Sequence, residues 1–234
     1  MIGDRLIEKM KNGLEIAGLI DHTLLRADAS EDEIEMLCEE AITYGFFSVC
    51  VNPSFVGKTV EVLSGTGVKV STVIGFPLGT SLKQVKVYEA IESVINGSDE
   101  LDIVINPGLA KAHKWEAVEK EISLVIAATP GVTHKIIIET AYLTDDEKIR
   151  ASLAVMNAGG EFVKTSTGFA PSGAVVKDVE LIRSATKGAV GIKASGSIHC
   201  LKDVKAFINA GATRIGTSSG VRIMEEIGRE KIKD

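Results

Sequence analysis

The sequence is poor in the residues that build disulfide frameworks and zinc sites. Its 234 residues include only three cysteines and four histidines. The cysteines form no C-x-x-C pair and the histidines stand apart along the chain, so no zinc motif is present. Three unpaired cysteines are typical of a reducing compartment, and we expect a cytoplasmic protein with free thiols. These residues are Cys38, Cys50, Cys200, His22, His113, His134 and His199.

The chain also lacks an excess of positive charge and any long apolar run. Its formal charge is −6 at pH 7 and its sequence pI is about 5.4, which argues against nucleic acid or an anionic membrane as a partner. Met1–Arg5 leads into an amphipathic segment rather than an apolar one, so we expect neither a signal peptide nor a membrane span. A local pocket for a small anion is compatible with this net charge.

Strand and helix patterns alternate along almost the whole chain. After a short amphipathic helix over Ile2–Asn12, eight strand-helix units follow without a linker or a change in composition. The expected strands are Glu15–Asp21, Phe46–Val51, Val68–Ile74, Glu100–Ile105, Lys135–Glu139, a short strand ending at Lys164, Ala189–Ala194 and Thr213–Ile215. The expected helices include Ser30–Gly45, Ser54–Leu63, Ser81–Ile95, Leu109–Ala128, Asp145–Asn157, Gly173–Thr186 and Cys200–Asn209, with a last helix reaching the C-terminus.

Eight such units in roughly 220 residues predict an α/β fold in which residues 1–234 form a single (β/α)8 barrel domain. The alternative is a doubly wound open sheet. No phosphate fingerprint of the GxGxxG or GxxxxGK[ST] type is present to favour that alternative.

The stretch Glu161–Gly168 places a lone lysine, Lys164, at the end of a short apolar strand and directly before a Thr/Ser/Gly turn. Phe162, Lys164 and Ser166 share one strand face, so the lysine points in the direction of apolar neighbours. A desolvated lysine has a lowered pKa, and its neutral amine can attack a carbonyl to form a Schiff base. A lysine that extends from the strand end to water is the equally open alternative.

Polar side chains gather at the predicted lumen of the barrel. The apolar set Leu101, Ile103 and Ile105 suits the helix layer, which leaves Asp102 facing inward, and the same count turns other polar residues inward. These are Asp21 and Thr23 of strand one, Cys50 of strand two and Lys193 of strand seven. Two lysines around one carboxylate leave an excess of positive charge that lowers the pKa of an amine, which favours chemistry.

Simpler interpretations of these residues stay open. The first is that Asp21 only caps the turn after strand one. The second is that Cys50 is a small buried hydrophobic residue. Asp102 and Lys193 form a structural ion pair in a third.

Glycine- and serine-rich segments follow the last three strands. They are Ser166–Gly168, Ser195–Ser197 and Gly216–Ser219. In a barrel, backbone amides and helix N-termini at these positions bind phosphate groups. Tight turns that need glycine for positive φ are the alternative explanation.

Seven segments together resemble the deoxyribose-phosphate aldolase family, and the resemblance runs almost from end to end. They are Ile20–Leu25, Val49–Pro53, Gly75–Gly79, Glu100–Asp102, Phe162–Gly168, Gly191–Gly196 and Arg214–Ser219. The resemblance implies a class I aldolase, without metal or other cofactor, that cleaves 2-deoxy-D-ribose 5-phosphate reversibly to glyceraldehyde 3-phosphate and acetaldehyde. It places the Schiff base on Lys164, proton transfer on Asp102 and Lys193, and Cys50 in the wall of the site.

For substrate binding we expect a further set of residues, most of them around the phosphate group. This set is Asp21, Thr23, Cys50, Thr165, Gly168, Gly196, Ser197, Gly216, Ser218 and Ser219. The chain departs from the family pattern where Ser-Gly-Gly-Ile-Arg is usual, because it has Ser195-Gly196-Ser197-Ile198-His199.

Two rival functions and the oligomeric state stay open. One rival is another Schiff-base aldolase of the transaldolase type, and the other is a phosphosugar-binding barrel that forms no imine. Ile2–Met10 and the apolar outer helices leave room for a homodimer or a homotetramer.

Overall fold

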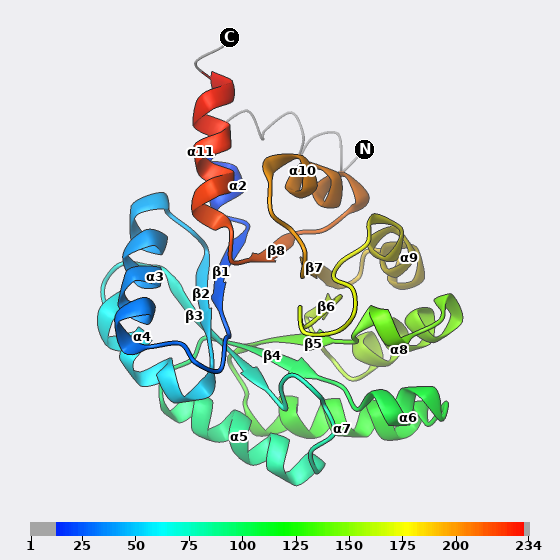
Figure 1. The fold of residues 1–234 in the computed structure, drawn as a ribbon. Coiled ribbons are helices and arrows are strands. Elements are labelled where there is room, and N and C mark those ends of the chain that lie inside the picture. Colours follow the sequence, from blue (N-terminus) through cyan, green and yellow to red (C-terminus); the bar gives the residue numbers. More distant parts are fainter. Residues whose placement is uncertain (1–12, 232–234) are drawn as a thin grey trace.

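Eight parallel strands close into a barrel in sequence order, β1 to β8, in a computed structural model that describes residues 13–231 (Figure 1). The strands are β1 (Ile20–Leu24), β2 (Ser48–Val51), β3 (Lys69–Ile74), β4 (Glu100–Val104), β5 (Thr133–Ile137), β6 (Phe162–Lys164), β7 (Gly191–Ser195) and β8 (Arg214–Thr217). Pairing of Asp21 with Gly216 closes the ring between β1 and β8. The predicted (β/α)8 barrel is therefore confirmed. The expectation that all of residues 1–234 form one domain stays a prediction.

Helices surround the barrel on the outside (Figure 1). They are α2 (Gly13–Ala17), α3 (Glu31–Tyr44), α4 (Val56–Leu63), α5 (Lys83–Ile95), α6 (Pro107–Lys111), α7 (Trp115–Ala128), α8 (Asp145–Asn157), α9 (Val176–Thr186), α10 (Leu201–Ala210) and α11 (Gly220–Lys231), with 3₁₀ turns η1 (Pro53–Phe55) and η2 (Thr140–Tyr142). None of the helices within residues 13–231 is long and apolar enough to cross a membrane.

The core lies between the strands and the helices. Alternate strand residues such as Leu101, Ile103 and Ile136 are fully buried there. Because successive side chains of a strand point to opposite faces, the residues between them face the lumen of the barrel. This parity places Asp102 and Lys135 inside the barrel, and it makes the lumen ionic rather than apolar.

Capping signals in the sequence fix several helix ends as expected. Ser30 and Glu33 form a capping box at the start of α3, and Gly45 ends that helix in the left-handed conformation at φ 69°. Thr144 and Glu147 form a second capping box, and α8 has the predicted bounds. Each box satisfies backbone N–H groups that the first helical turn leaves unpaired.

Two expected elements are wrong. The first predicted strand, Glu15–Asp21, begins as helix α2, and the Leu19 N–H donates to the Ile16 carbonyl before the strand starts at Ile20. The predicted helix Leu109–Ala128 is two helices, because His113 at φ 54° ends the first of them. Left-handed backbone cannot continue an α-helix. The expected N-terminal helix over Ile2–Asn12 lies outside the described residues.

Candidate active site

Three strands bring the predicted catalytic side chains together in the lumen. The Asp102 carboxylate of β4 accepts through Oδ2 from the Lys164 amine of β6 and the Lys193 amine of β7, each at 2.7 Å. All three side chains are almost completely buried. The sequence therefore located these groups correctly, and the lysine does not simply extend to bulk water.

Three further charged residues of the lumen were missed. Lys135 of β5 donates to Asp102 Oδ1 at 2.7 Å and lies 2.7 Å from Glu100 Oε2. Arg214 of β8 donates to Glu100 at 3.0 Å and to Asp21 Oδ1 at 2.8 Å. The strand parity that identified Asp102 also predicts these residues. Ile136 and Ile215 face the helices, so the adjacent Lys135 and Arg214 face the lumen.

The ion-paired cluster holds more positive than negative groups. Its four cations and three carboxylates are Lys135, Lys164, Lys193, Arg214, Asp21, Glu100 and Asp102. One cation is therefore in excess when every group is charged. Loss of the proton from a single amine leaves three charges of each sign, which is the arrangement that a buried cluster favours.

Lys164 is the one cation of this cluster whose pKa is lowered. Burial lowers the pKa of Lys164, and the neighbouring Lys193 lowers it further against the attraction of Asp102. Burial also acts against the charged form of Lys193, but Asp102 and Asp21 outweigh it and raise the pKa of that amine. Burial alone would raise the pKa of Asp102, yet Lys135, Lys164 and Lys193 hold it well below its usual value. The amine whose pKa is lowered is thus the one beside the cavity.

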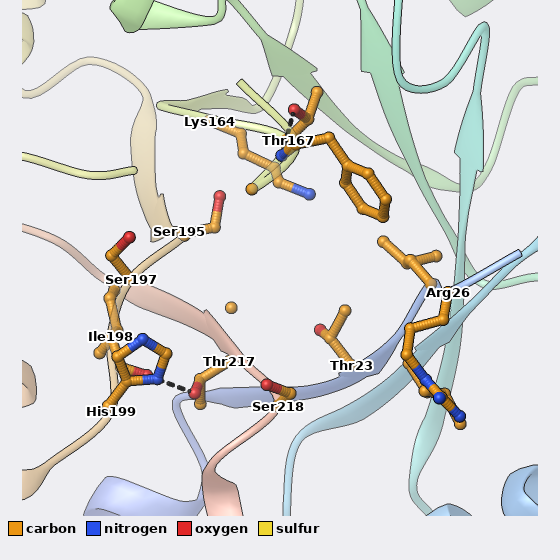
Figure 2. Close-up of a pocket in the computed structure, with 16 residues that line it drawn as sticks. Thr23, Arg26, Lys164, Thr167, Ser195, Ser197, Ile198, His199, Thr217 and Ser218 are labelled. Carbon is orange, nitrogen blue, oxygen red and sulfur yellow. Dashed lines mark hydrogen bonds between the residues drawn. The ribbon is translucent and has the colours of Figure 1, made fainter. Parts of the chain in front are cut away.

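A cavity of about 470 Å³ opens above this cluster at the carboxyl ends of the strands. Lys164 is the member of the cluster that lines it, and Figure 2 shows its amine directed into the space between Thr23, Ser195 and Ser218. The loops after β6, β7 and β8 form most of the wall. A small molecule with a carbonyl at Lys164 and an anionic end at these loops fits such a cavity.

Comparison with known proteins identifies the family. Residues 16–226 match the DeoC/LacD family of aldolases. The chain belongs to this family. A deoxyribose-phosphate aldolase from Coprothermobacter proteolyticus is 51% identical over 214 residues, covering 92% of this chain and 98% of that protein. Another from Caldanaerobacter subterraneus subsp. tengcongensis is 48% identical over 224 residues, 94% of this chain and 97% of that one. The solved tetrameric deoxyribose phosphate aldolase from Aeropyrum pernix has a TM-score of 0.88 at 33% identity, covering 97% of both chains.

Six of the predicted binding residues line the cavity of this DeoC/LacD aldolase. They are Thr23, Gly168, Gly196, Ser197, Gly216 and Ser218. Gly216 lies so close to the Lys193 side chain that an added Cβ would be 2.9 Å from Lys193 Cε. A larger residue at this position would push the lysine away from Asp102.

The other predicted binding residues lie around the cavity without forming its wall. Asp21 is buried in the ion-paired cluster, with Lys193 at 2.5 Å. Cys50 is fully buried against Leu25 and Val73, and burial raises the pKa of its thiol. Thr165 links β6 to β7 by donating to the Ser195 carbonyl and accepting from the Ser195 N–H. These contacts support the wall, so the direct binding role that we expected for them stays a prediction.

The loop after β7 has the two family departures. Ser197 has the left-handed backbone conformation at φ 59°, which an L-residue adopts at a cost and glycine adopts readily. Its side chain is exposed in the cavity wall. His199 also lines the cavity, and its Nδ1 lies 3.3 Å from the hydroxyl of Ser219, the last of the predicted binding residues.

Within residues 13–231, no group of three or more His, Cys, Asp and Glu side chains is placed to hold a metal ion. The expectation that the enzyme needs no metal or other cofactor stays a prediction.

Proposed function

We propose that this protein is a class I deoxyribose-phosphate aldolase, acting on 2-deoxy-D-ribose 5-phosphate in deoxyribose catabolism. The observation that carries the proposal is the buried Lys164, whose pKa is lowered and whose amine faces the cavity. The names of the relatives that are about half identical over nearly their whole length support the same substrate.

Lys164 starts the reaction as a nucleophile. Its neutral amine adds to the C1 aldehyde, and loss of water from the adduct gives an iminium ion. The iminium then accepts the electron pair of the C2–C3 bond as the C3 hydroxyl loses its proton. That step releases glyceraldehyde 3-phosphate and leaves an enamine, which is protonated at C2 and hydrolysed to acetaldehyde.

Asp102 and Lys193 move the protons in this proposal. Asp102 Oδ2 contacts both amines at 2.7 Å, so one carboxylate oxygen joins the nucleophile to a second, charged lysine. Proton transfer along such a contact needs no movement of the backbone. Lys193 supplies, on the same carboxylate, the positive charge that a neutral Lys164 does not carry.

The phosphate end of the substrate lies at the loops after β6, β7 and β8 in this proposal. Gly168, Gly196, Ser197 and Ser218 all line the cavity there, and backbone N–H groups of this kind bind phosphate without fixed side-chain charge.

The decisive experiment is borohydride trapping. The purified protein is treated with acetaldehyde and borohydride, and peptide mass spectrometry locates the adduct, which we expect on Lys164 and not in Lys164→Met. An adduct on Lys193 would exchange the two roles, and binding of substrate without any adduct would favour the silent barrel. Product analysis with 2-deoxyribose 5-phosphate separates this activity from another Schiff-base aldolase, and undiminished activity in EDTA tests the absence of a metal requirement.

We also propose that the chain forms a homodimer or a homotetramer. Helix α5 buries Lys86, Ala90 and Ser93, while Tyr88 and Ile95 on the same helix are 65% and 71% exposed. A helix with an apolar outer surface is suited to an interface between copies. The Aeropyrum pernix relative is described as a tetramer, and light scattering on the purified protein measures the assembly directly.

We propose a cytoplasmic location as well. Cys38, Cys50 and Cys200 are all free thiols, and free thiols are usual in a reducing compartment.

A further inference from the structure

Two turns in the cavity wall are built in the same way. After β6, the Thr167 hydroxyl accepts from the N–H of Phe169 at 3.1 Å, a bond drawn in Figure 2. After β8, the Thr217 hydroxyl accepts from the N–H of Ser219 at 2.9 Å. In both turns the threonine bridges to the residue two positions later and fixes the backbone between them.

Each turn leaves the middle N–H group free. Within residues 13–231, the N–H groups of Gly168 and Ser218 have no hydrogen-bond partner in the protein, and both residues line the cavity. The threonine hydroxyl thus uses the flanking donor and leaves the central one for a ligand. A phosphate oxygen is the partner that such donors favour.

The two threonine hydroxyls differ in the acceptor of their own proton. Thr217 donates to the main-chain carbonyl of Ile198 at 2.7 Å. Thr167 donates to the carboxylate of Glu139, which also accepts from the Thr167 N–H at 3.1 Å. A charged acceptor makes these bonds stronger than neutral ones, so Glu139 clamps one residue of the β6 turn through both of its donors.

Glu139 has a strained conformation that local sequence does not explain. It is 2% exposed, with φ 51° and ψ 72°, in the left-handed region that glutamate rarely adopts. Strained backbone of this kind persists where the surrounding structure requires it, and it gathers at functional sites. This backbone conformation directs the Glu139 side chain from the end of β5 to the loop after β6, where Thr167 is its hydrogen-bond partner.

We propose that Glu139 and Thr167 are positioning residues for the phosphate group of the substrate. Glu139 holds Thr167, Thr167 holds the N–H of Phe169, and the unpaired N–H of Gly168 is thereby directed at the phosphate. Neither side chain takes part in bond making. This role rests on the proposed function, because it assumes that the phosphorylated end of the substrate lies at the loops after β6 to β8.

The test compares 2-deoxyribose 5-phosphate with unphosphorylated 2-deoxyribose in four variants. Thr167→Val keeps the shape of the side chain but removes the hydroxyl, and Thr167→Ser restores it. Glu139→Gly removes the carboxylate while accepting the left-handed backbone without strain. Thr186→Val is the matched control, since Thr186 is a buried threonine of α9 whose hydroxyl donates to the Ile182 carbonyl at 2.9 Å.

We expect Thr167→Val and Glu139→Gly to raise KM for the phosphorylated substrate roughly 10- to 100-fold, the effect of misplacing one hydrogen bond to a charged group. Their kcat, and their kcat/KM for deoxyribose, should stay within a few-fold of the wild type, so the preference for phosphate falls. Thr167→Ser and Thr186→Val should keep that preference.

An equal loss for both substrates, or an unchanged preference in Thr167→Val, would overturn the positioning role. Far-ultraviolet circular dichroism and the melting temperature show whether each variant is folded. If Glu139→Gly is not folded, Thr167→Val against Thr167→Ser carries the comparison. Wild-type protein without activity on 2-deoxyribose 5-phosphate would instead refute the proposed function itself, so the two failures are distinguishable.

Discussion

The charge balance of the lumen makes a quantitative prediction for Lys135, which lies below the cavity. Lys135→Met replaces the amine with an uncharged side chain of similar length. It removes contacts of 2.7 Å to Asp102 and 2.7 Å to Glu100. With Lys164 neutral, the cluster then holds two cations against three carboxylates. The excess negative charge favours the protonated form of Lys164, so its pKa must rise.

The size of the shift follows from the geometry. Lys135 and Lys164 bind opposite oxygens of the same carboxylate, each at 2.7 Å. At a separation of roughly 5 Å and an effective dielectric constant of about 20, two unit charges interact by about 3 kcal/mol. That energy corresponds to about two pKa units. At a pH below the new pKa of Lys164, the neutral fraction of its amine therefore falls roughly 100-fold.

The assay is the rate of borohydride trapping with acetaldehyde, measured from pH 6 to 10. We expect the acid limb of the profile to move upward by about two units in Lys135→Met, with the rate recovering at high pH. Loss of a buried partner also destabilises the fold by about 3 to 5 kcal/mol, so a control with a similar loss is needed.

Lys86→Met is that control. Lys86 is a fully buried lysine that donates to Glu121 at 2.6 Å and to the Val104 carbonyl at 2.7 Å, outside the lumen. It should lose stability without a change in the pH profile. A uniform loss of trapping rate at every pH in Lys135→Met, with no shift of the acid limb, would refute the charge-balance reasoning.

Two further predictions concern Asp102 and Ser197. Asp102→Asn should lower kcat by roughly 100-fold or more while the protein still folds, because the amide cannot relay a proton. Steady-state assays and thermal melts test this, and a near-normal kcat with reduced stability would make Asp102 a purely structural partner of the lysines. Ser197→Gly should raise the free energy of unfolding by up to about 1 kcal/mol, because glycine adopts φ 59° without a Cβ clash; urea denaturation measures the change, and a loss of stability would contradict the strain assigned to this residue.

The sequence was sufficient for the fold and for placing Lys164 in the lumen, because both depend on local patterns. Alternating apolar runs predict strands and helices, and the position of Lys164 at a strand end before a polar turn predicts its place in the barrel. The sequence was less informative where a short segment has two stable conformations. Residues 15–17 carry a pattern that predicts the start of a strand, but they lie in helix α2, which packs against α11.

The charged partners of Lys164 were only partly predictable. Strand parity predicts that Lys135 and Arg214 face the lumen. Their pairing with Asp102 and Asp21 depends on the register between β4 and β5 and on the closure of the ring between β1 and β8, which lie far apart in the sequence. The role of Glu139 was less accessible still, because a left-handed glutamate has no sequence signature. Thr165, beside Lys164, joins β6 to β7 through contacts that the local sequence does not predict, and its binding role stays a prediction.

The ionic lumen has a consequence for protein engineering. The lowered pKa of Lys164 arises among six other charged side chains on five strands, β1, β4, β5, β7 and β8, and the backbone register of the barrel holds them within contact distance. Transplanting one lysine to the end of strand six of an unrelated barrel would give a buried amine without these partners, and its protonation would be governed by burial alone. A designer who wants this nucleophile must therefore transplant the counter-charges with it, as one unit.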